Sequence, residues 1–175
     1  MSAAQTVVLE TERLVLSKLT TADAPFVLEL LNDEAFVRHI GDRGVRTLDD
    51  ACGYILAGPV AMYDEHGFGL WKVELCATGE PIGICGLLKR ETLPNVDLGF
   101  ALLPRFRSQG YGVESARAVM GYGKRVLGLQ RIVAITSLDN ETSANLLNKV
   151  GLRFERLMEL GDKREKLRLF AWNLE

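Results

Sequence analysis

A strand that leads into a glycine-rich turn and then a helix is the feature that most constrains this chain. Residues 97–102 alternate between large apolar side chains and small or polar ones, which indicates a strand with one apolar face. Pro104 ends its pairing, because proline has no N–H for a sheet ladder. Gly110 and Gly112 then precede an apolar stripe at helical spacing that starts at Val113. A helix N-terminus of this kind exposes backbone N–H groups and the positive end of the helix dipole, so the stretch predicts an anion site.

The turn itself has the pattern Arg-x-x-Gly-x-Gly, over Arg107-Ser108-Gln109-Gly110-Tyr111-Gly112. No Gly-Lys-Ser/Thr follows, which excludes the nucleotide-binding Walker loop. The glycine spacing also differs from that of the dinucleotide-binding turn. The alternative interpretation is a tight strand-to-helix turn that needs glycine only for its backbone angles.

Composition excludes several classes of protein. The chain has 175 residues with a net charge of −2, so it lacks the basic surface expected for nucleic acid or an anionic membrane. Its apolar runs are shorter than a membrane span, and no signal-peptide pattern opens it, so we expect a cytoplasmic protein. The three cysteines (Cys52, Cys76, Cys85) and two histidines have no metal-ligand or disulfide spacing, so we expect no metal.

The order of elements predicts one domain over residues 1–175. We expect residues 1–10 to be a loose lead-in and residues 32–46 to be irregular. The predicted order is a strand, two helices, three strands, a helix, a strand, a helix and two strands. Because a helix connects residues 97–102 to the apolar strand 131–137, those two strands should be parallel. Pro59 should kink or end the second helix.

Three separated stretches, in order, resemble the GNAT acetyltransferases. The Arg-x-x-Gly-x-Gly turn is similar to their acetyl-CoA pyrophosphate loop. TERLVLSKLTTADAPFVLELLND, from residue 11, and LDNETSANLLNKVGLRFE, from residue 138, look like the opening and closing segments of the RimJ/RimL branch. That branch acetylates protein N-termini and, in relatives, small amines. The resemblance implies an α/β GNAT fold: a mixed, mostly antiparallel seven-stranded sheet with helices on both faces, whose fourth and fifth strands are parallel and splayed.

The resemblance also implies where acetyl-CoA binds. Its pantetheine would pair with the backbone of the fourth strand, which must part from the fifth. Its pyrophosphate would accept hydrogen bonds from the turn, with Arg107 or Arg105 adding charge. The cofactor-binding residues implied are Ala101, Leu102, Leu103, Arg107, Ser108, Gln109, Gly110, Tyr111, Gly112, Asn140 and Asn145.

The chemistry implied is direct attack of a neutral amine on the thioester, with a backbone N–H stabilising the oxyanion. Many GNAT enzymes protonate the departing sulfur with a tyrosine, but Leu147 occupies that position here. Asn145, and after it Ser137 or Ser143, are the nearest polar replacements. Asp97, at the place where related enzymes carry a glutamate, is the candidate base.

The acceptor site should be walled by the two N-terminal helices. Candidate lining residues are His39, Arg43, Tyr63, Trp71 and Glu74, of which Glu74 is also an alternative base. For Trp71, Asp97 and Glu74 a purely structural role is the alternative. The acceptor amine and the choice between monomer and homodimer stay open. A CoA-binding module without catalysis, and a nucleotide- or phosphate-binding interaction domain, are the competing functions.

Overall fold

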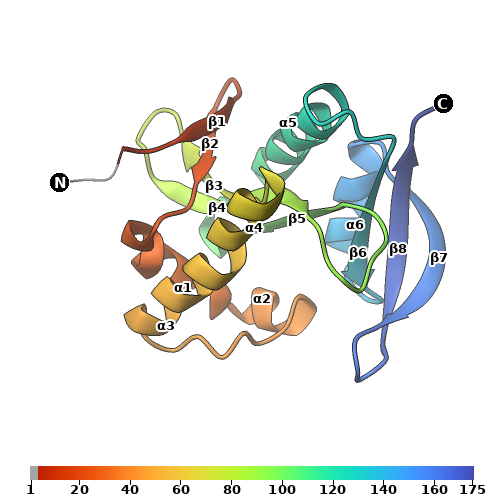
Figure 1. Cartoon of the computed structure of the whole chain (residues 1–175), viewed down its shortest axis with the longest axis horizontal. Coiled ribbons are helices and arrows are strands. Elements are labelled where there is room, and N and C mark those ends of the chain that lie inside the picture. The colour runs from red at the N-terminus through yellow and green to blue at the C-terminus, as the bar shows by residue number, and fades with distance from the viewer. Residues whose placement is uncertain (1–3) are drawn as a thin grey trace.

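Eight strands form one mixed sheet (Figure 1). The computed structural model describes residues 4–175. The strands are β1 (Val7–Glu10), β2 (Leu14–Lys18), β3 (Leu70–Leu75), β4 (Pro81–Leu88), β5 (Asp97–Leu102), β6 (Arg131–Ser137), β7 (Arg153–Leu160) and β8 (Glu165–Asn173). Their order across the sheet is β1-β2-β3-β4-β5-β6-β8-β7. Every neighbouring pair is antiparallel except β5 and β6, which are parallel as predicted.

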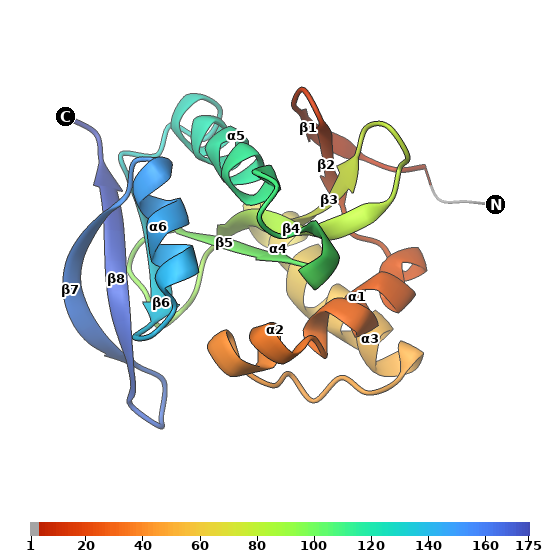
Figure 2. The ribbon, with the colours of Figure 1, turned by 180° about the vertical axis from the view of Figure 1, so that it is seen from behind.

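Helices cover both faces of this sheet (Figures 1 and 2). The α-helices are α1 (Ala24–Leu31), α2 (Glu34–His39), α3 (Leu48–Ile55), α4 (Ala61–His66), α5 (Tyr111–Arg125) and α6 (Glu141–Lys149). Single turns of other helix types are η1 (Thr21–Asp23), η2 (Leu56–Val60) and η3 (Pro104–Phe106). Figure 2 shows α5 above β4 and β5 with α1 and α3 below them, and α6 in front of β6 and β8.

The two larger of three apolar cores follow from the alternation of side chains along the strands. Leu16 of β2 and Leu98 of β5 are buried against α5, which contributes Val119 and Met120. Ile84 of β4 belongs instead to a core with the apolar faces of α1, α2 and α3. Because successive strand residues point to opposite faces, one sheet supports both cores. The mixed sheet with helices on both faces agrees with the architecture that the resemblance implied.

The predictions of a loose lead-in over residues 1–10 and an irregular segment over residues 32–46 were wrong in part. Residues 7–10 form an eighth strand, β1, on the edge of the sheet, and the rest of the predicted lead-in up to residue 3 lies outside the described residues. The strand is too short to show an alternation. Helix α2 interrupts the predicted irregular segment, because Asp33 caps it by accepting the N–H of Phe36.

Pro59 lies in a π-helical turn that links α3 to α4. The wider turn accommodates a residue that has no N–H to donate, so the helical path bends without ending there. No helix within residues 4–175 is long and apolar enough to cross a membrane.

Candidate functional site

A gap between β5 and β6 is the centre of the candidate site. The two strands have one register pair, Asp97 with Val133, beside a hydrogen bond from the Val133 N–H to the Val96 carbonyl at 3.0 Å. On its other side, β5 pairs with β4 along its whole length. The predicted splay is therefore present, and the part of β5 beyond Asp97 has a strand partner on one side only.

Backbone alternation decides which groups of β5 face this gap. Val96 bonds to β6, whereas the N–H of Leu103 donates to Ile82 of β4 at 2.8 Å. Even-numbered residues therefore turn their backbone groups to β6, so Phe100 and Leu102 face the gap. Of the three residues predicted to pair with pantetheine, Leu102 faces the gap, while Ala101 and Leu103 turn their backbone groups to β4. Phe100 was not anticipated.

The predicted anion cradle follows β5. Ser108 and Gly110 have left-handed φ angles of 62° and 85°, which curl the chain into the start of α5. The first-turn residues of α5, Tyr111 and Gly112 among them, have no intrahelical acceptor for their N–H groups. Among residues 4–175, we find no protein acceptor for the N–H groups of Ser108, Gln109 or Gly110 either. The turn therefore presents a row of free donors at a positive helix end.

Gly112 is constrained by the protein as well as by any ligand. A Cβ at this position would lie 2.8 Å from Cδ1 of Leu146 on α6. The start of α5 and the middle of α6 thus approach closely. Leu147, which stands where many relatives carry a tyrosine, is fully buried, and Asn145 is exposed on the same helix.

The guanidinium of Arg107 is held by the protein. It donates to the Leu102 carbonyl at 2.8 and 3.1 Å and to the Asp33 carboxylate at 2.6 Å. Arg107 therefore connects the end of β5 with the N-cap of α2. Arg105 pairs with Glu29 of α1 at 2.6 Å. Phosphate contact by either arginine stays a prediction.

Sequence reasoning missed a second support for the turn. Arg13, between β1 and β2, donates to the Gln109 carbonyl at 3.1 Å and to Glu114 at 2.7 Å, and its guanidinium lies 4.4 Å from the ring centre of Tyr111. Burial opposes ionisation of Glu114, but hydrogen bonds from Thr11 and Arg13 outweigh it and hold the pKa of Glu114 below its ordinary value. These partners are about a hundred residues apart in the chain, and no local pattern signals them.

Asp97 lies at the closed end of the gap. It is 1% exposed, and both of its carboxylate oxygens lie 3.2 Å from Nε of Arg90. Burial raises its pKa to about 6 although Arg90 opposes that change. The carboxyl group has a titration range suited to proton transfer, but no exposed face.

Trp71 and Glu74 lie away from the gap, in β3. Trp71 is fully buried, with its ring edge-on to Tyr122 of α5 at 5.1 Å, and its Nε1 has no partner within residues 4–175. Glu74 accepts from Lys72 at 2.7 Å and from Gln5 at 2.8 Å. Both display structural roles, and their contact with an acceptor stays a prediction.

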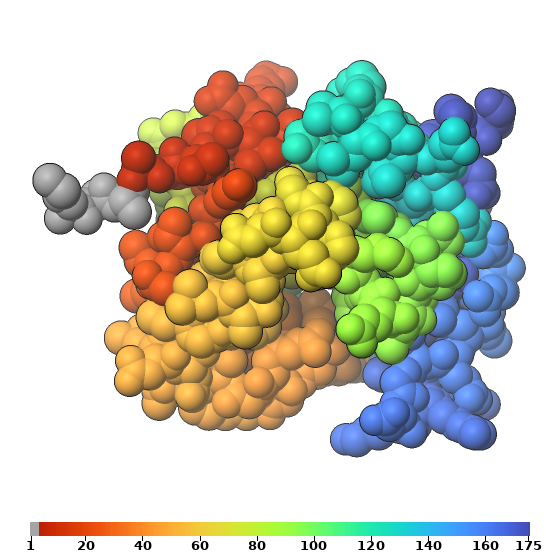
Figure 3. Space-filling model, viewed as in Figure 1, coloured from red at the N-terminus to blue at the C-terminus, as the bar shows by residue number. Residues whose placement is uncertain are grey.

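Two other predicted lining residues differ in exposure. Tyr63 is buried and its hydroxyl donates to the Leu70 carbonyl, whereas Arg43 is exposed. Figure 3 shows a hollow on the face where α3, α4 and the loop over residues 89–96 meet. The second of the two N-terminal helices that were expected to wall the acceptor site, here α3 and α4, therefore borders this hollow.

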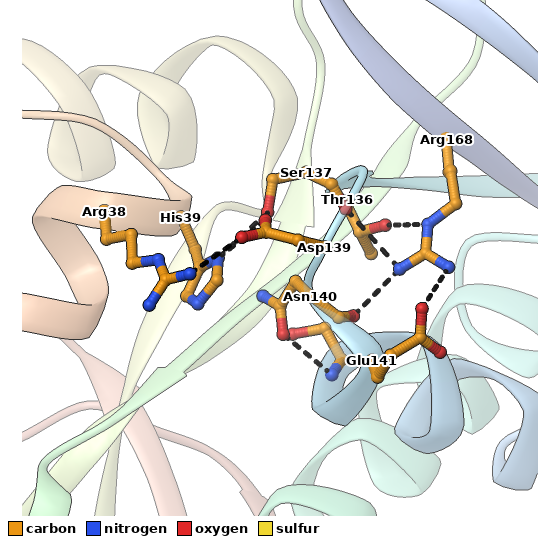
Figure 4. Close-up of polar contacts among 9 residues, drawn as sticks. Arg38, His39, Thr136, Ser137, Asp139, Asn140, Glu141 and Arg168 are labelled. Carbon is orange, nitrogen blue, oxygen red and sulfur yellow. Dashed lines mark hydrogen bonds and ion pairs between the residues drawn. The ribbon is translucent and has the colours of Figure 1, made fainter.

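A polar corner lies at the end of β6 (Figure 4). His39, the last residue of α2, places Nδ1 2.9 Å from the hydroxyl of Ser137 and 3.7 Å from Asp139. Ser137 donates to Asp139 at 3.2 Å, and Arg38 donates to the other oxygen of Asp139 at 2.9 Å. The structure thus brings together two residues that the sequence nominated separately, His39 and Ser137.

Arg168 of β8 fixes this corner from the other side (Figure 4). It donates to the Asn140 carbonyl at 3.1 Å and pairs with Glu141 at 2.9 Å. The Asn140 side chain accepts the N–H of Ser143 at 3.1 Å, so it caps α6. The amide oxygen of Asn140 is therefore already occupied.

Several known proteins that are similar to this chain are acetyltransferases. The acetyltransferase (GNAT) domain family matches residues 13–153. YoaA of Bacillus subtilis, an uncharacterised N-acetyltransferase, is 30% identical over 152 residues, or 86% of this chain and 85% of that protein. An acetyltransferase structure from Agrobacterium tumefaciens has a TM-score of 0.80 at 25% identity, covering 99% of this chain and 96% of that one. The complex of coenzyme A with RimL, an acetyltransferase of ribosomal protein L7/L12, has a TM-score of 0.80 at 15% identity, covering 96% and 98%.

Proposed function

The chain belongs to the GNAT acetyltransferase family and is an acetyl-CoA-dependent acetyltransferase, and from that premise we propose that it acetylates a primary amine by direct attack. The acceptor is a protein N-terminus or a small-molecule amine. The parting of β5 and β6 directly before a row of free N–H donors carries this proposal.

In this proposal the pyrophosphate of acetyl-CoA accepts hydrogen bonds from the N–H groups between Ser108 and Gly112. The pantetheine arm then follows β5, where the backbone of Phe100 and Leu102 lacks a neighbouring strand. Such an arm carries amide groups, so it can pair with a strand edge as another strand would. Asn145, exposed on α6, is the proposed side-chain contact to the cofactor.

The amine approaches from the hollow between α3, α4 and the loop over residues 89–96 (Figure 3). It attacks the thioester carbon, an N–H facing the gap stabilises the oxyanion, and CoA leaves as the thiolate. We assign Ser137, together with His39 and Asp139 in the polar corner, to the transfer of protons during the reaction. Asp97 stays a candidate base, but a buried carboxyl group paired with Arg90 would need a water molecule to reach the amine.

The test has two parts. Calorimetric titration measures CoA binding, with ATP and NAD as comparison ligands. An assay of thiol release with a panel of small amines and N-terminal peptides then measures transfer. Preferential binding of CoA together with thiol release and an acetylated product supports the proposal. Binding without release across the panel favours an inactive CoA-binding module, which the buried Leu147 makes the second candidate. Preference for ATP or NAD contradicts both.

A further inference from the structure

The location of His39 relative to the gap rests on how α2 is attached. At its N-terminal end, Asp33 contacts Arg107, which in turn contacts the carbonyl of Leu102 at the end of β5. At its C-terminal end, His39 contacts Ser137 at the end of β6. Helix α2 therefore reaches from one wall of the gap to the other at its open end.

Hydrogen-bond counting decides which nitrogen of His39 carries a proton. The carboxylate of Asp139 can only accept, so the single hydroxyl proton of Ser137 goes to it, at 3.2 Å. The Ser137 oxygen then accepts from the imidazole, so Nδ1 of His39 carries a proton. In the neutral ring the second nitrogen, Nε2, keeps a free lone pair.

We propose that His39 is the general base of acetyl transfer, that its Nε2 takes the proton of the attacking amine, and that Ser137 and Asp139 are the positioning residues that fix its tautomer. This inference rests on the proposed function. It assigns the base to a residue for which the sequence suggested only contact with the acceptor.

The step balances without another reactant. The amine nitrogen forms a bond to the carbonyl carbon while its proton passes to Nε2 of His39. The C–S bond of the tetrahedral intermediate then breaks, and its electron pair leaves with CoA as the thiolate. Water protonates the thiolate, and the imidazolium returns its proton to solvent.

The surrounding charges suit a base that cycles between neutral and protonated states. Asp139 faces the ring from the corner between β6 and α6, and a hydrogen bond from Arg38 holds the pKa of Asp139 below its ordinary value. Its negative charge can stabilise the imidazolium as it forms. Arg38 lies on α2 itself, and Arg168 is neutralised by Glu141 on the far side of the corner. The His39 side chain is 20% exposed, so part of it remains in contact with solvent.

The test compares His39→Gln with His66→Gln, the matched variant of the chain's other histidine, which lies at the end of α4 and stacks on Phe68. The acceptor is the best amine of the panel, and kcat/KM is measured against pH. We expect His39→Gln to lower kcat/KM by about 100-fold and to remove the low-pH limb of the profile. The CoA affinity of this variant should stay within about twofold, and His66→Gln should match the unmodified protein.

A second variant guards against a change in folding. His39→Ala leaves a space beside Ser137, and added imidazole should restore part of its activity in proportion to concentration. Asp97→Asn is the competing arm. The inference is overturned if Asp97→Asn removes the low-pH limb of the kcat/KM profile while His39→Gln keeps both that limb and the unmodified kcat/KM. That outcome leaves the acetyltransferase proposal standing. Absence of transfer by the unmodified protein overturns both.

Discussion

Replacement of Asp33 tests whether α2 is held as the structure indicates. The Asp33 carboxylate accepts the N–H of Phe36 and pairs with Arg107 at 2.6 Å, and its side chain is 9% exposed. Loss of a helix N-cap costs about 1 kcal/mol. Loss of the charged hydrogen bond costs about 1 kcal/mol more, which is below the usual range of about 1.5–3 kcal/mol because the Arg107 side chain is 38% exposed and screened by water. Asp33→Ala should therefore destabilise the protein by about 2 kcal/mol.

Asp33→Asn separates the two contributions. Asparagine caps helices as well as aspartate does but carries no charge, so this variant should lose about 1 kcal/mol. In a chain of this size 1 kcal/mol corresponds to about 2–4 °C in Tm. We expect a fall of about 4–8 °C for Asp33→Ala and half of that for Asp33→Asn. Thermal unfolding followed by circular dichroism measures both, with urea unfolding as a check on the free energies.

Asp162→Ala is the control, since Asp162 lies exposed in the turn between β7 and β8. It should change the stability by less than about 0.5 kcal/mol. Equal losses for the two Asp33 variants would mean that the cap contributes nothing. A loss for Asp33→Ala no larger than that for Asp162→Ala would refute the attachment of α2 to Arg107.

Three further changes probe the cradle, the buried acid and the packing of α5. Gly110→Asp should weaken CoA binding by at least about tenfold in calorimetry relative to Gly110→Asn, which has the same shape without the charge; equal affinities would contradict the placement of the pyrophosphate. Because the folded pKa of Asp97 is raised from 3.8 to about 6, its contribution is fully present below pH 4 and is lost as pH rises through 6. Urea unfolding should show the protein losing about 3 kcal/mol over that range, and a similar loss in Asp97→Asn would exclude Asp97 as the cause. Gly112→Ala should cost about 1–2 kcal/mol because its Cβ would meet Leu146, and less in a Leu146→Ala background; additive costs would rule out that contact.

The main architecture could be predicted because short stretches of the sequence show the apolar spacing of strands and helices. Alternation identifies β5 and β6, and the helical stripe of α5 identifies their connection, so parallel pairing follows from chain geometry. The family resemblance supplied the splay and the cofactor turn. Short elements escaped prediction: β1 and α2 have four and six residues, too few for a period to be recognised.

The contacts within the site could not be predicted, because they join residues far apart in the chain. Nothing near Arg107 in the sequence indicates that Asp33 and the Leu102 carbonyl occupy its guanidinium. His39 and Ser137 were both nominated, yet their contact spans 98 residues and depends on the unpredicted helix α2. The separation of Trp71 and Glu74 from the gap was equally hidden, since strand residues at the same spacing can face either a core or a cleft.

The single register pair between β5 and β6 has a mechanical consequence. One half of the sheet runs from β1 to β5, and the other comprises β6, β8 and β7. In the described part of the chain, the pair of Asp97 with Val133 is the only strand pairing between the two halves. A cofactor arm that bonds along β5 would act as the missing strand and brace the halves against each other. On CoA binding, hydrogen exchange of the amides of β5 and β6 should then slow far more than exchange of the amides in the edge strands β1 and β7.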